Sequence, residues 1–122
     1  MSNAHPWLDQ IPWTTKPLPR DMLENRIQRA LTLTNLGMLG TLGLKGPIVS
    51  PLEFYADKFT IYILPQPGSP KLKAMQRNPR VSFAVANPMA GWVVAQGAQL
   101  FGNAEILDPG TSDWEYGMTI FR

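Results

Sequence analysis

The sequence predicts a mainly β domain with a few helices, arranged as a small closed or split barrel of mostly antiparallel strands. Short apolar runs alternate with Gly, Pro and Asn turns along most of the chain, which is typical of strands joined by tight turns. Two segments, 22–33 and 70–77, carry helical signals and interrupt the strands. Closure into a barrel would remove the free edges that many short strands otherwise leave.

The composition of the 122 residues fits a globular protein and argues against several kinds of site. The formal net charge is only +2, whereas nucleic-acid binding needs a basic stripe. The chain has no cysteine and a single histidine, His5, so disulfides, a His-based relay and a Cys/His metal site are not expected. No apolar run is long enough to span a membrane and no signal peptide is visible, so we expect a cytoplasmic protein without membrane partners.

The first 20 residues predict an irregular arm, followed by a single domain over 21–122. Four of the 12 prolines lie in this arm, where they disfavour regular structure. Trp7 and Trp13 are large apolar side chains that must dock on some surface. Two alternatives remain open, the domain's own surface and a neighbouring subunit.

The first predicted helix covers 22–33 and is followed by strands. Asp21 and Glu24 have the spacing of a capping box, and apolar residues then recur at helical spacing. The glycines in 37–43 favour a close approach of neighbouring groups or a bend in the strand. Pro51 predicts an edge position or a bulge for its strand. The strands are predicted from 38 to a turn at 45–47 and at 48–55, 59–64, 80–86 and 92–107, with a short helix from 108.

Residues 70–77 predict a second helix, whose start is a candidate anion-binding site. Ser69 is a favourable N-cap, and Pro70 suits the first helical position because its missing N–H would have no partner there. Lys71 adds positive charge at the positive end of the helix dipole, where several unpaired N–H groups are expected. This combination favours a bound phosphate, and an ordinary capped helix with a solvated lysine is the alternative.

No residue pattern indicates a catalytic acid, base or nucleophile. The chain has no GxGxxG and no Walker-type loop, and its carboxylates are scattered along the sequence. Any chemistry is therefore expected to come from a bound cofactor. The catalytic residues stay unassigned.

Several short motifs resemble, in their order and spacing, those of one protein family. Gly-Ser-Pro-Lys at 68–71, followed by Asn-Pro-Arg-Val at 78–81, is the most specific pair. The other motifs are Leu-Gly-Thr-Leu-Gly at 39–43, Lys-Gly-Pro-Ile-Val-Ser-Pro at 45–51, Ile-Tyr-Ile at 61–63 and Gly-Asn-Ala-Glu at 102–105. Over roughly residues 23–108, the chain resembles the pyridoxamine 5′-phosphate oxidase-like family of FMN-binding split barrels.

The resemblance implies a fold, a cofactor and a partner. Members of that family form homodimers of six-stranded split barrels, with FMN in the groove between the subunits. The resemblance therefore implies about six strands, FMN as the cofactor, a homodimer and a small oxidoreductase acting on a small molecule. Two alternatives remain open: a non-catalytic module that binds flavin or haem, and a deazaflavin-dependent reductase on the same fold.

The resemblance also implies which residues bind the cofactor. Lys71 matches the lysine that meets the FMN phosphate, and Ser69 lies in the same loop. Leu64 and Pro65 match a pair that borders the cofactor at the end of the third strand. Gln99 faces the side of a family glutamine, displaced by two residues, and Gln96 is the less favoured alternative.

The strand segment Val49, Ser50, Pro51 and Leu52 matches the family segment that passes along the phosphate, ribityl chain and ring of FMN. Val49 stands where the oxidases themselves have an arginine for the phosphate, and Phe54 stands where they have a lysine. The chain stops at Arg122, before the C-terminal extension that carries their substrate contacts. True pyridoxamine phosphate oxidase activity is therefore not expected.

Overall fold

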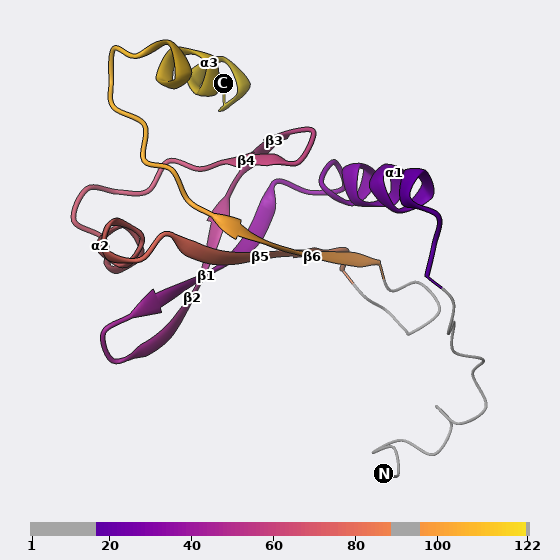
Figure 1. Cartoon of the computed structure of the whole chain (residues 1–122), viewed down its shortest axis with the longest axis horizontal. Helices are drawn as coiled ribbons and strands as arrows, with labels where there is room; N and C mark the ends of the chain where they lie inside the picture. Colours follow the sequence, from indigo (N-terminus) through magenta and orange to yellow (C-terminus); the bar gives the residue numbers. More distant parts are fainter. Residues whose placement is uncertain (1–16, 89–95, 122) are drawn as a thin grey trace, which may run out of the picture.

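The computed structural model describes residues 17–88 and 96–121, and its fold is mainly β. In this part of the chain, six strands are interrupted by three helices (Figure 1). Every pairing among the described strands is antiparallel, which confirms the predicted fold class of about six mostly antiparallel strands. In chain order the elements are α1 (Arg20–Ala30), β1 (Leu36–Gly43), β2 (Gly46–Glu53), β3 (Tyr55–Asp57), β4 (Thr60–Tyr62), α2 (Pro70–Arg77), β5 (Arg80–Ala86), β6 (Gly97–Asn103) and α3 (Ser112–Phe121).

Four strands form the larger sheet in the order β2-β1-β5-β6, and β3 and β4 form a separate hairpin. β1 pairs along its whole length with β2, from Leu36 opposite Glu53 to Gly43 opposite Gly46. On its other side β1 pairs with β5, which in turn pairs with β6. β2 is therefore an edge strand, as Pro51 predicts, because a proline cannot donate a hydrogen bond to a further strand.

One face of the larger sheet, the inner face, packs against α1 and α2 and carries the core. Phe54 is only 1% exposed and meets the Phe83 ring edge to face, with ring centroids 4.9 Å apart. Burial of such a side chain contributes roughly 1.5–3 kcal/mol to stability. The core consists of Ala30, Leu31, Leu39, Phe54, Met75, Phe83 and Val85.

The opposite face of the larger sheet is called the outer face. It carries several large apolar side chains that other described residues leave exposed. The strand register defines it: Met38 points to this face together with Pro51 on β2 and Ala84 on β5. Exposed apolar patches of this kind mark interaction surfaces. Its large apolar side chains, which are 40 to 80% exposed, are Leu36, Met38, Leu42, Val49 and Phe101.

The start of α1 differs from its prediction. The helix spans 20–30 instead of 22–33, its N-cap is Pro19, and no side chain caps it. Asp21 therefore lies inside the first turn, and Glu24 accepts a hydrogen bond from Arg20 at 2.9 Å. The predicted capping box is wrong. Pro19 suits the position just before a helix because the residue preceding the first turn needs no helical N–H bond.

The predicted strand 48–55 is divided at Phe54. β2 ends at Glu53, and the next strand belongs to the separate hairpin. Phe54 is buried in the core, and its N–H donates to Asn35 O at 2.8 Å. The hairpin turns at Lys58, whose φ is 55°, and β4 is shorter than the predicted strand 59–64.

α2 and β5 match their predicted ranges, and the end of the chain is more helical than expected. α3 spans ten residues and is capped by Thr111, whose Oγ1 accepts a hydrogen bond from Trp114 N–H at 3.3 Å. Figure 1 shows α3 beyond the β3–β4 hairpin, away from the larger sheet. In the part of the chain that the structure describes, no helix is long and apolar enough to cross a membrane.

Two predictions fall wholly or partly outside the described residues. Residues 1–16 of the predicted arm, with Trp7 and Trp13, are among them. So are residues 92–95 at the start of the predicted strand 92–107, of which β6 covers the middle. These predictions stay open.

Candidate functional site

The start of α2 has the predicted N-cap but fewer free N–H groups than expected. Ser69 Oγ accepts a hydrogen bond from Leu72 N–H at 3.4 Å, and Ser69 O accepts one from Lys73 N–H at 3.1 Å. Pro70 has no N–H. Among these first-turn amides, that of Lys71 alone has no hydrogen-bond partner within the described residues. The expectation of several unpaired donors is therefore wrong, because the cap itself uses them.

Lys71 lines a cavity of about 490 Å³, the Lys71 cavity, where four segments meet. Small-molecule sites typically occupy about 300–1,000 Å³. The cavity brings together four residues that the resemblance assigned to the cofactor, Leu52, Leu64, Pro65 and Lys71. Its walls come from the end of β2, the segment after β4, the first turn of α2 and the end of α3: Leu52, Glu53, Ile63, Leu64, Pro65, Gln66, Lys71 and Phe121.

The two charged side chains of the Lys71 cavity have opposite signs. Lys71 is half-buried and Glu53 is exposed. They form no ion pair, since the one salt bridge among the described residues joins Arg20 and Glu24. The helix dipole adds about half a positive charge at the start of α2. Across residues 17–88 and 96–121, no three His, Asp or Glu side chains cluster so as to hold a metal ion.

Ser69, the N-cap of α2, lines neither cavity, and the remaining predicted cofactor-binding residues lie on the larger sheet. Val49 and Pro51 point to the outer face, whereas Ser50 points to the inner face opposite Leu39. Gln99 points to the outer face from β6, the opposite edge of the sheet. Three strand spacings separate the two edges, so Gln99 is roughly 14 Å from β2. None of these residues lines the Lys71 cavity, and their role stays a prediction.

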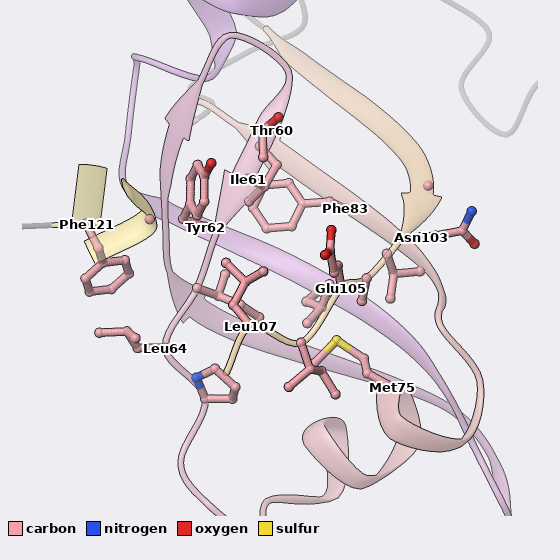
Figure 2. A pocket seen from close by; sticks show the side chains of 18 of the residues that line it. Thr60, Ile61, Tyr62, Leu64, Met75, Phe83, Asn103, Glu105, Leu107 and Phe121 are labelled. Carbon is pink, nitrogen blue, oxygen red and sulfur yellow. The ribbon is translucent and has the colours of Figure 1, made fainter. Parts of the chain in front are cut away.

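A larger cavity of about 1070 Å³ adjoins the Lys71 cavity, and the two share Ile63, Leu64, Pro65 and Phe121. It lies between β4, α2, α3 and the segment that follows β6 (Figure 2). Its lining is mostly apolar, and its charged side chains, Glu105 and Asp113, are acidic. No lysine or arginine of the described residues lines it. Lys71 is therefore the cation that either cavity offers to an anion.

Helix α3 borders both cavities and is held on the β3–β4 hairpin. The Tyr116 hydroxyl donates a hydrogen bond to the Asp57 carboxylate, which raises the pKa of Tyr116 above its ordinary value of 10.0. The rings of Tyr55 and Phe121 meet edge to face, with centroids 5.1 Å apart. These contacts place Phe121 at the wall that the two cavities share.

Sequence reasoning missed four residues of the Lys71 cavity, Glu53, Ile63, Gln66 and Phe121. Glu53 directly follows the segment that the resemblance assigned to the cofactor, so its position along the chain was a usable signal. What the sequence could not show is that the end of β2 meets the start of α2. Phe121 had no comparable signal, because its position depends on how α3 packs.

Comparison with known proteins gives a family match over most of the chain. A family model described as pyridoxamine 5′-phosphate oxidase matches residues 23–120. No curated protein matches the chain in sequence.

Several solved structures share the fold, and three of them are informative. A FAD-binding protein from Mesorhizobium loti is 25% identical with a TM-score of 0.63; the match covers 76% of this chain and 65% of that one. A haem-binding protein from Mycobacterium smegmatis is 22% identical with a TM-score of 0.67, covering 87% and 43%. HutZ, the haem storage protein from Vibrio cholerae, is 17% identical with a TM-score of 0.67, covering 80% and 71%. The chain thus spans less than two thirds of the first two proteins.

Proposed function

The chain belongs to the pyridoxamine 5′-phosphate oxidase family, and we propose on this basis that it binds FMN and acts as a small oxidoreductase in the cytoplasm. A bound flavin would supply the redox chemistry by cycling between its oxidised and reduced forms. The chain would hold the phosphate, orient the ring and leave one ring face open to a small substrate. The FAD-binding protein from Mesorhizobium loti supports a flavin, since it shares the fold at 25% identity.

The observation that carries this proposal is the meeting of Leu64, Pro65 and Lys71 at one cavity. The hydrogen-bond donors at the start of α2 are of the kinds that bind phosphate in proteins. The Lys71 ammonium can form charge-assisted hydrogen bonds with phosphate oxygens, and its backbone N–H points from the positive end of α2. The Ser69 hydroxyl, which accepts from Leu72 N–H, still has its own hydrogen to donate.

We further propose that two copies associate through the outer face. Its exposed apolar side chains favour burial against a second copy. Within one chain, Val49 and Gln99 lie on the two edge strands of the sheet, roughly 14 Å apart. In a dimer, residues of the outer face from both subunits could border one flavin, as the family resemblance implies.

The site does not fit a phosphorylated substrate. Val49 carries no charge, and Lys71 is the one cation at either cavity in the described part of the chain. A second phosphate would therefore lack a counter-charge. This site suits hydride or electron transfer, for which positioning of the flavin matters more than a proton relay.

The absorption spectrum of the purified protein tests the proposal. Flavin bands, or uptake of added FMN by a colourless preparation, would support it; a protein that stays colourless in the presence of FMN would contradict it. A haem spectrum would instead favour a non-catalytic haem-binding module, which the two haem proteins with this fold suggest. A deazaflavin spectrum would favour a reductase of that class.

A further inference from the structure

We propose that Glu53 determines specificity at the Lys71 cavity: it makes the cavity tolerate a phosphate on the flavin without requiring one. The inference rests on the proposed flavin function. It adds a statement about which forms of the flavin, with or without a phosphate, the site accepts. Riboflavin ends in a neutral hydroxyl and FMN in a phosphate monoester. The consequence is that these two flavins bind with similar affinity.

The charges around the Lys71 cavity do not balance a phosphate monoester. Such a group carries about −1.5 to −2 charges at neutral pH. Lys71 supplies one positive charge, the start of α2 adds about half a charge, and Glu53 removes one. Most of the charge of the phosphate would therefore stay uncompensated by the cavity.

The hydrogen-bond donors are equally few. The N–H groups of Leu72 and Lys73 are used within the helix start. A phosphate has three oxygens that accept hydrogen bonds, and buried anions are usually met by several backbone donors or an arginine fork. The donors that remain are the Lys71 N–H, the Lys71 ammonium and the side-chain amide of Gln66, which also lines the cavity; the Ser69 hydroxyl lies at the N-cap and is not part of the lining.

Glu53 is positioned to act on whatever enters the cavity. It is the last residue of β2, it lies opposite Leu36 in the sheet, and it forms no ion pair within the described residues. An ionised carboxylate accepts hydrogen bonds and donates none. Glu53 is therefore compatible with the hydroxyl groups of a ribityl chain, whereas it repels the oxygens of a phosphate.

Dissociation constants for FMN and riboflavin, measured by flavin fluorescence quenching at constant ionic strength, test this role. For the wild type we expect the two constants to differ by about tenfold or less. Glu53→Gln removes a like charge beside the phosphate, so it should tighten FMN by about three- to tenfold and leave riboflavin unchanged. Glu115→Gln is the matched control, because it removes an exposed carboxylate that lines neither cavity, and it should change neither constant.

Both substitutions change exposed side chains, and circular dichroism verifies that the variants fold. A wild-type preference for FMN above about 100-fold would overturn the role of Glu53. An FMN-to-riboflavin ratio that Glu53→Gln leaves unchanged would overturn it too. In either case flavin binding itself would stand. If the wild type and Glu53→Gln bind neither flavin, the proposed flavin function fails, and the role of Glu53 fails with it.

Discussion

Gly37 of β1 is a glycine because the Phe83 ring occupies the space that a side chain would need. A Cβ at this position would lie 2.2 Å from the ring, and Phe83 is buried in the core. We expect Gly37→Ala to lower the free energy of unfolding by about 1–3 kcal/mol, as over-packing of a core does. Gly102→Ala on β6 is the control, since a Cβ there meets nothing within 4 Å. Urea denaturation of both variants measures the difference, and equal losses would contradict this account.

Lys71 carries most of the positive charge available to a flavin phosphate. We expect Lys71→Ala to weaken FMN binding by about 1.5–3 kcal/mol, the usual contribution of a charge-assisted hydrogen bond, and to leave riboflavin binding unchanged. Riboflavin would then become the tighter ligand. Lys73→Ala is the matched control, because Lys73 is exposed on the same helix and lines neither cavity. Equal FMN affinity of the two variants in a fluorescence titration would show that the phosphate lies elsewhere.

At the scale of elements, α3 is attached to the β3–β4 hairpin by a hydrogen bond whose contribution depends on pH. The bond from Tyr116 to Asp57 raises the pKa of Tyr116 above 10.0, so the folded state favours the protonated phenol. Its stabilisation is fully present below pH 10.0 and is lost as the pH rises through the raised pKa. We expect the difference in Tm between wild type and Tyr116→Phe to stay constant in neutral solution and to shrink above about pH 10. A difference that persists unchanged in strong alkali would exclude this contact.

Elements with local signals at both ends could be predicted from the sequence. Ser69 and Pro70 mark the start of α2, and Asn78 with Pro79 separates it from β5, so both ranges agree with the structure. The ends of α1 and β2 could not be predicted in this way. Phe54 leaves the strand because it fills the core against Phe83, and that contact spans residues far apart in the sequence.

At the scale of the whole molecule, contacts between residues far apart in the sequence also decide the candidate site, and the sequence does not predict them. Leu64, Pro65 and Lys71 lie close together along the chain, and an ordered set of motifs indicated them. Glu53 and Phe121 join them only because β2 and α3 end at the same place in space. The sign of the charge beside Lys71 is therefore a property of the fold, and no local pattern predicts it.

The outer face predicts self-association of the whole molecule. Val49 and Phe101 are 69% and 80% exposed on this face. We expect Val49→Asp or Phe101→Asp to weaken dimerisation by about 2 kcal/mol or more, because each places a charge in an apolar interface. Met22→Asp is the control: Met22 is 44% exposed on α1, which packs against the inner face. Sedimentation velocity measures all three. A monomeric wild type, or a loss of the dimer in the control as well, would contradict an interface at the outer face.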